Sequence, residues 1–186
     1  MLERMARNSR EKTLDFLNER LAFERAGVKL YDRVLEVMAS RASEDTERIR
    51  STMQQHRDEE KEHEEWLEAQ VRSLGGDAHA TTERSELVTR ESKGIEEVVM
   101  SDAQLPHLFH ALLAAELVDN AGWDLLAQLA DEAGDHEAER AFKKRLHEEE
   151  DHLVYVRKIV EKLSLRDLLG EDAKLPRSDG LLGMLS

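Results

Sequence analysis

Two short segments of the chain carry the same pair of potential metal ligands. Glu60-Lys-Glu-His63 and Glu149-Glu-Asp-His152 both read Glu-x-x-His. Residues three apart lie on one face of an α-helix, so both side chains of each pair can reach a single interior point. In both segments an aromatic and an aliphatic residue follow the histidine after the same interval. The two segments are therefore predicted to occupy equivalent places in a repeated structure.

Each segment is preceded by a stretch that contains one further glutamate. Glu24 lies 36 residues before Glu60, and Glu116 lies 33 residues before Glu149. An aromatic residue and an aspartate follow both Glu24 and Glu116 seven and eight residues later. The chain is therefore predicted to be an internal repeat of two helical hairpins, each of which contributes one glutamate and one Glu-x-x-His pair.

Apolar residues at steps of three and four predict the helices that position these side chains. Ser43, with acidic residues behind it, favours the start of the second helix, and Gly75-Gly76 favours its end. Ser101 and Gln104 have the spacing of a capping box, and Pro106 suits a first helical turn, so the third helix is expected to start there. Four long helices with two short connections and one long one predict an all-α, four-helix bundle with a long crossover between its second and third helices.

The predicted bundle covers residues 1–163, and residues 164–186 are interpreted as a C-terminal tail. The two hairpins and the crossover between them are expected at about 10–75, 102–163 and 76–101. Because a loop of this length without structure is unusual in a compact domain, a short helix is expected within Glu86–Met100.

Nine polar residues interrupt the apolar stripes and would face the interior of the bundle. They are Glu24, His56, Glu60, His63, Glu116, Asp119, Arg145, Glu149 and His152. Burying an ionised carboxylate without compensation is costly, so buried charges are paired or bind a metal. The carboxylates outnumber the single arginine of this set, and a bound cation would balance them. The alternative is a metal-free bundle in which the charges pair among themselves.

The composition excludes several classes of function. Lysine and arginine total 27 against 41 for aspartate and glutamate, a net charge of −14, which argues against nucleic acid as a partner. The absence of cysteine excludes disulfides, thiolate zinc sites and iron–sulfur clusters. The N-terminal residues contain no apolar signal segment, and no apolar run is long enough to span a membrane. We therefore expect a soluble, cytoplasmic protein.

Over about residues 10–163 the sequence resembles the ferritin-like di-iron carboxylate proteins, with a rubrerythrin-like arrangement. The resemblance implies six metal ligands, which are Glu24, Glu60, His63, Glu116, Glu149 and His152. It also implies that Glu60 and Glu149 bridge two metals, whereas the other two glutamates bind one metal each. Rubrerythrins carry a second glutamate three residues after the third-helix ligand, where this chain has the shorter Asp119. A rubredoxin-like iron site needs cysteine, so any electron donor must be a separate molecule.

The predicted ligand set indicates the metal and the function. Four carboxylates and two imidazoles suit iron or manganese, and four negative charges offset two divalent ions. The favoured function is a non-haem di-iron oxidoreductase that oxidises Fe(II) or reduces peroxide or O₂. A dimanganese catalase-like enzyme, an iron storage or sequestration protein and a metal-free structural module are the alternatives. The resemblance also implies a homodimer.

Three polar residues are expected beside the ligands. His56 and Arg145 each lie four residues before a predicted bridging glutamate, and Asp119 lies three residues after Glu116. Polar partners of this kind orient the residues that bind a metal. Arg145 is expected to pair with Asp119 or with a ligand carboxylate.

The end of the tail is apolar and contains two glycines, after a polar stretch. It resembles the C-terminal targeting peptides that load ferritin-like cargo into encapsulin shells. The resemblance implies a segment that docks to a protein shell, and a docked or disordered terminus is the alternative.

Overall fold

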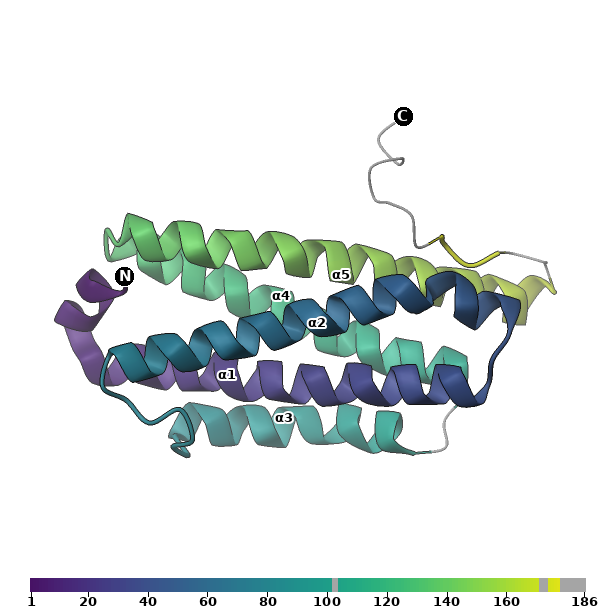
Figure 1. The fold of residues 1–186 in the computed structure, drawn as a ribbon, viewed down its shortest axis with the longest axis horizontal. Helices are drawn as coiled ribbons and strands as arrows, with labels where there is room; N and C mark the ends of the chain where they lie inside the picture. Colours follow the sequence, from purple (N-terminus) through teal and green to yellow (C-terminus); the bar gives the residue numbers. More distant parts are fainter. Residues whose placement is uncertain (102–103, 171–173, 178–186) are drawn as a thin grey trace.

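Four long helices lie side by side, and a fifth, shorter helix lies against the outside of one of them (Figure 1). The computed structural model describes residues 1–101, 104–170 and 174–177. Its helices, in chain order, are α1 (Glu3–Ser40), α2 (Glu44–Ser73), α3 (Glu83–Met100), α4 (Leu105–Glu132) and α5 (His136–Leu169). Among the described residues no strand forms, so the predicted all-α class is confirmed. In that same part of the chain, no helix has both the length and the apolar composition that crossing a membrane requires.

The helices are arranged as two hairpins joined by the predicted crossover. α1 packs along α2, and α4 packs along α5. α3 belongs to the crossover and packs against α1 and α4 (Figure 1). α3 is the helix expected within Glu86–Met100. It begins three residues earlier, at Glu83, because Thr82 and Ser85 form a capping box there.

Local sequence signals account for most of the helix ends. Ser43 caps α2, as predicted, and its side chain accepts a hydrogen bond from the Thr46 backbone N–H. Gly75 adopts a positive φ of 68° just after α2, which a residue with a side chain rarely does. The capping box expected at Ser101 and Gln104 is wrong. The Ser101 hydroxyl donates to the carbonyl of Val98 and so closes the end of α3 instead.

The N-terminal residues extend the first hairpin beyond its predicted start near residue 10. The backbone leaves the helical conformation at Ser9, so the first turns of α1 bend across the end of the bundle (Figure 1). The Arg4 backbone N–H donates to Asp135 Oδ2 at 2.8 Å, and Leu2 and Met5 are buried. This segment closes one end of the core against the turn between α4 and α5.

The C-terminal boundary also differs from the prediction at residue 163. α5 continues to Leu169, and Leu175 is buried at 4% exposure in an apolar cluster of the bundle. The first part of the predicted tail therefore packs on the bundle, because its leucine removes apolar surface from water. The docking segment expected at the end of the chain, residues 178–186, lies outside the described residues.

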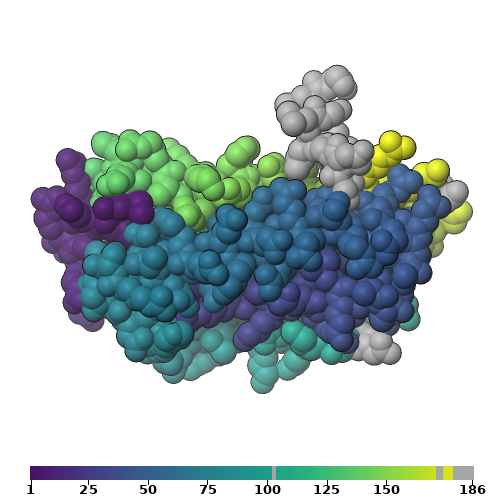
Figure 2. All heavy atoms as spheres, in the orientation of Figure 1, coloured from purple at the N-terminus to yellow at the C-terminus, as the bar shows by residue number. Residues whose placement is uncertain are grey.

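The apolar core is divided into two clusters, and the polar residues predicted to face the interior lie between them. One cluster contains Tyr31, Val34 and Tyr155, and the other contains Leu17 and Trp123. α2 covers much of the near face of the molecule, with α5 beside it (Figure 2). The polar residues between the two clusters are consequently removed from solvent.

Candidate metal centre

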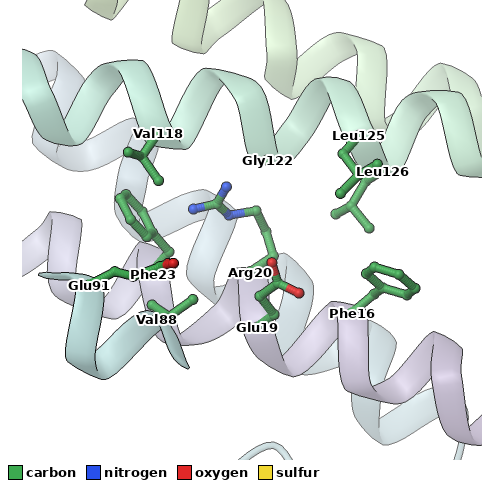
Figure 3. A pocket seen from close by; sticks show the side chains of 10 residues that line it. All are labelled: Phe16, Glu19, Arg20, Phe23, Val88, Glu91, Val118, Gly122, Leu125 and Leu126. Atoms are coloured by element: carbon green, nitrogen blue, oxygen red, sulfur yellow. The ribbon is translucent and has the colours of Figure 1, made fainter. Parts of the chain in front are cut away.

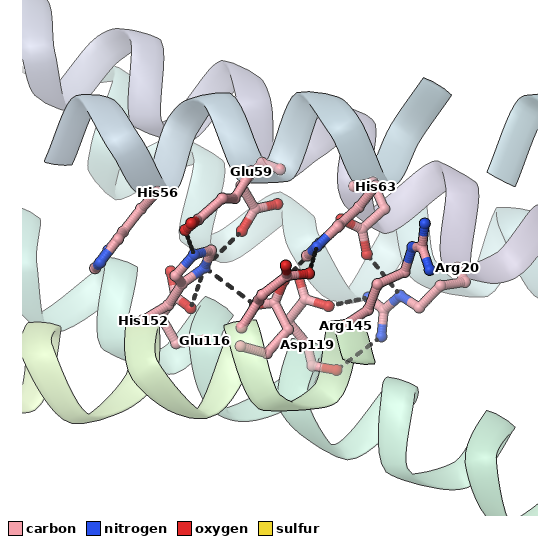
Figure 4. A network of polar contacts seen from close by, with 12 residues as sticks. Arg20, His56, Glu59, His63, Glu116, Asp119, Arg145 and His152 are labelled. Atoms are coloured by element: carbon pink, nitrogen blue, oxygen red, sulfur yellow. Dashed lines mark hydrogen bonds and ion pairs between the residues drawn. The ribbon is translucent and has the colours of Figure 1, made fainter. Parts of the chain in front are cut away.

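The structure brings all six predicted ligands together in the middle of the bundle. α1 contributes Glu24, α2 contributes Glu60 and His63, α4 contributes Glu116, and α5 contributes Glu149 and His152. Each of these side chains is at most 2% exposed. One helix turn separates the Glu and His of each Glu-x-x-His pair, so both lie on the buried face of their helix. The side chains of His63 and His152 extend into the space between the helices (Figure 4).

Two groups of ligand atoms, one around each histidine, share Glu149. One atom each from Glu60, Glu116, Glu149 and His152 lie within 4.8 Å of one another, as do single atoms of Glu24, His63 and Glu149. Glu60 and Glu149 also lie in a third such group, with Glu24 and Asp119. The arrangement is compatible with two neighbouring cation positions with Glu60 and Glu149 between them. We call these the His63 position, with Glu24, and the His152 position, with Glu116.

The two histidines present the same ring nitrogen to the centre. His63 Nδ1 lies 2.9 Å from Glu149 Oε1, and its Nε2 lies 3.0 Å from Glu148 Oε2. His152 Nδ1 lies 3.3 Å from Glu149 Oε2, and its Nε2 lies 2.8 Å from Glu59 Oε2. A carboxylate on the outer nitrogen fixes the ring and its tautomer, which is typical of histidines that bind metals.

Glu59 and Glu148 are functional residues that the sequence interpretation missed, because both lie in charged runs typical of solvated helix faces. The available signal was the repeat itself, which reads Glu-Glu-x-x-His in both hairpins. Each of these glutamates contacts the histidine of the other hairpin: Glu59 of α2 contacts His152, and Glu148 of α5 contacts His63. The spacing along one helix contains no information about this crossing.

The buried donor atoms fit a metal. Buried side-chain atoms without a hydrogen-bond partner include both oxygens of Glu24 and Glu149, one oxygen each of Glu60 and Glu116, and Nδ1 of His63 and His152. Buried polar atoms normally have partners, and such a concentration at one point is unusual. Carboxylate oxygens and imidazole nitrogens are suitable donors for iron or manganese. Two divalent cations would satisfy these atoms and offset the four glutamates.

The electrostatics of the protein without metal follow from this crowding. Burial raises the pKa of Glu60 well above its usual range, and burial together with nearby Glu149 raises the pKa of Glu116 to about 8. Burial alone would raise the pKa of Glu149, but the nearby positive charges of His152 and His63 hold it well below the usual range. For His63 burial opposes protonation, yet the hydrogen bond between its Nε2 and Glu148, together with the charge of Glu24, raises its pKa to about 12. Protons therefore occupy the centre where cations would bind.

Metal uptake is expected to release these protons. His63, with a pKa of about 12, and Glu116, with a pKa of about 8, both hold protons at neutral pH and must lose them to bind a cation. The affinity for Mn(II) should therefore rise with pH, by about tenfold per pH unit or more between about pH 6 and 8. Calorimetric titration in buffers of different ionisation enthalpy measures the protons released. Binding heats that do not depend on the buffer would contradict this prediction.

His56 and Tyr31 adjoin the His152 position. The Tyr31 hydroxyl donates to Glu116 Oε1 at 2.5 Å, and His56 Nδ1 lies 3.4 Å from the same hydroxyl oxygen. The rings of His56 and His152 stack with centroids 4.1 Å apart. Burial, and then the charge of His152, lower the pKa of His56 well below its usual range, so it is neutral. His56 therefore lies beside the predicted ligands, as expected.

The expected pairing of Arg145 with Asp119 or a ligand carboxylate is wrong. Arg145 donates to the carbonyl of Ala141, and its guanidinium lies 3.7 Å from the centroid of the Trp66 ring. Asp119 pairs instead with Arg20 of α1, whose Nη2 lies 3.1 Å from Asp119 Oδ1. Arg145 contacts a carbonyl of its own helix and the Trp66 ring of α2. Arg20 reaches Asp119 because α1 packs against α4.

Two glycines in helix interiors leave room for these side chains. A Cβ on Gly27 would lie 2.2 Å from Glu60 Oε2, and a Cβ on Gly122 would lie 1.6 Å from Arg20 Nη1. Glycine inside a helix is unfavourable, so its presence at both points indicates a steric requirement. The sequence interpretation assigned neither residue a role.

The fold and the buried carboxylate–histidine clusters define a ferritin-like helical bundle. A crystal structure described as "ferritin like, diiron-carboxylate proteins from Bacillus anthracis str. Ames" is similar, with a TM-score of 0.63 and 14% identity. The match covers 81% of this chain and 96% of that one. The chain belongs to the family described as Domain of unknown function (DUF892), whose model matches residues 4–169. The comparison with curated proteins gives no match.

Proposed function

We propose that this chain is a di-iron oxidoreductase of the ferritin-like type, which oxidises Fe(II) or reduces peroxide or O₂. The observation that supports it best is the sharing of Glu149 between two groups of buried ligand atoms, most of which lack a hydrogen-bond partner. Glu24, Glu60, His63, Glu116, Glu149 and His152 would hold the metals. Two bound Fe(II) ions would supply two electrons, enough to reduce one peroxide to two waters with two protons.

The chain's own residues would supply orientation and exclusion of water. Glu59 and Glu148 hold the outer nitrogens of the histidines, so Nδ1 of each ring stays directed at the centre. The two apolar clusters on either side keep bulk water away. The Tyr31 hydroxyl hydrogen bond to Glu116 restricts that carboxylate to one orientation. The centre would thus be held in place before metal arrives.

Within this class we propose a rubrerythrin-like arrangement with an external electron donor. Each hairpin supplies one glutamate and one Glu-x-x-His pair, and Asp119 lies three residues after Glu116. The sequence contains no cysteine for an iron–sulfur donor site of its own. We also propose a homodimer, for which exposed Leu117 and Leu125 of α4 offer apolar surface. A monomeric mass by light scattering would contradict the dimer.

Metal loading tests the proposal directly. Ligands that bind only the folded state stabilise it, so protein loaded with Fe(II) without oxygen should melt roughly 5–10 °C above chelated protein. Elemental analysis should find two metals per chain and identify them as iron or manganese. Consumption of peroxide or of Fe(II) with O₂ then distinguishes an enzyme from an iron store. Equal melting temperatures for chelated and loaded protein would remove the main support for the centre.

A further inference from the structure

We infer that Arg20 makes the two metal positions unequal, so that the His152 position fills first and the His63 position binds its metal more weakly. The inference rests on the proposed function, because it concerns the same centre. It assigns a role to an arginine that is not a ligand and that touches one position only.

Contacts on several sides hold the Arg20 guanidinium next to the centre. Its Nε lies 3.3 Å from Glu24 Oε1, its Nη2 lies 3.1 Å from Asp119 Oδ1, and its Nη1 donates to the Asp119 carbonyl at 3.0 Å. The guanidinium lies 4.5 Å from the centroid of the Phe23 ring. Gly122 faces it from α4 without a side chain (Figure 3). The side chain is only 6% exposed, so these contacts fix its position.

The guanidinium separates the centre from a small pocket. A cavity of about 60 Å³ lies between α1, α3 and α4, and Arg20, Phe23 and Gly122 are among its lining residues (Figure 3). The same guanidinium contacts Asp119 (Figure 4) and Glu24, which belong to the centre. An arginine remains charged under all ordinary conditions. A permanent positive charge therefore borders the His63 position.

Within the described residues, no arginine or lysine forms an ion pair at the His152 position. Its terminal glutamate, Glu116, receives a hydrogen bond from the neutral hydroxyl of Tyr31. Arg20 lies four residues before Glu24, and the residue four before Glu116 is the buried, apolar Leu112. The repeat therefore preserves the ligands but places an arginine four residues before only one of the two terminal glutamates, Glu24.

This asymmetry acts on metal affinity in two ways. A fixed positive charge in a buried site opposes the entry of a divalent cation, and solvent screens it little. Arg20 also forms ion pairs with Oε1 of Glu24 and Oδ1 of Asp119, and these contacts compete with a cation at the His63 position for the two oxygens. The negative charge of Asp119 offsets part of the repulsion. Removal of Arg20 and removal of Asp119 should therefore change the affinity in opposite directions.

The test is a calorimetric titration of the metal-free protein with Co(II). Wild type should give two dissociation constants that differ by about tenfold or more, which corresponds to about 1.4 kcal/mol. Arg20→Met should tighten the weaker constant by about tenfold, whereas Asp119→Asn, which keeps the arginine, should loosen it. A merely structural role would move both variants the same way. Arg25→Met is the matched control, because Arg25 lies on the same helix and pairs with Glu64 and Glu68 outside the centre.

Two histidine variants assign the constants. His63→Ala should abolish the weaker binding event and His152→Ala the tighter one. If Arg20→Met does not fold, Arg20→Gln in the Asp119→Asn background should tighten the weaker constant relative to Asp119→Asn alone. Equal constants in wild type, or a weaker constant that Arg20 substitution leaves unchanged, would overturn this inference but not the proposed function. A wild-type protein that binds no Co(II) would overturn the proposed function itself.

Discussion

Replacing Glu149 with alanine is expected to remove both metals from the protein. Glu149 is the one residue present in all three groups of ligand atoms, and both of its oxygens are buried without a hydrogen-bond partner. Each oxygen lies next to a different histidine, at 2.9 Å from His63 Nδ1 and 3.3 Å from His152 Nδ1. Its loss therefore takes a donor from both positions. Elemental analysis after Fe(II) loading and dialysis should fall from two metals per chain to nearly none.

Variants of the other glutamates separate bridging from terminal roles. Glu60→Ala should resemble Glu149→Ala, because Glu60 also lies in groups on both sides of the centre. Glu24→Ala should empty the His63 position preferentially and leave the other partly filled. Glu150→Ala, an exposed neighbour on the same helix, is the control and should keep two metals. Every variant should remain helical by circular dichroism, because the apolar clusters on either side are unchanged. Two tightly bound metals in Glu149→Ala would refute the bridging assignment.

Gly27→Ala is expected to separate metal binding from stability. A Cβ at this position would lie 2.2 Å from Glu60 Oε2, the end of a flexible side chain that can move aside. The metal-free protein should therefore keep its stability or gain up to about 1 kcal/mol, because alanine favours the helix over glycine. The displaced Glu60 carboxylate can no longer serve both positions. Metal affinity should fall by about tenfold or more, measured by the same Co(II) titration.

Gly94→Ala is the matched control for this substitution. Gly94 lies within α3, and a Cβ there would meet no atom within 4 Å. The substitution should raise the melting temperature by roughly 2–4 °C through helix propensity and leave both Co(II) constants unchanged. Wild-type metal affinity in Gly27→Ala would show that the glycine does not serve the centre.

The fold class, and the set of residues that can meet at a centre, follow from the amino-acid sequence alone. Steps of three and four in apolar residues predicted four long helices, and the spacing of Glu60 and His63, repeated in Glu149 and His152, placed each pair on one face. These features depend only on the geometry of a single helix. The repeat predicts that the two hairpins are equivalent. It therefore predicts that six buried polar residues meet at one point, but it does not give the distances between their atoms.

The pairing of the residues around the ligands depends on how the helices pack against one another. Glu59 contacts His152 and Glu148 contacts His63 because the hairpins pack face to face, and no spacing along one chain segment encodes that contact. Arg145 and Arg20 both lie four residues before a predicted ligand, yet Arg20 alone pairs with Asp119. A helix period fixes the direction in which a long side chain leaves its helix. The partner it reaches depends on which neighbouring helix comes close, and a glycine on that helix, Gly122, leaves the space.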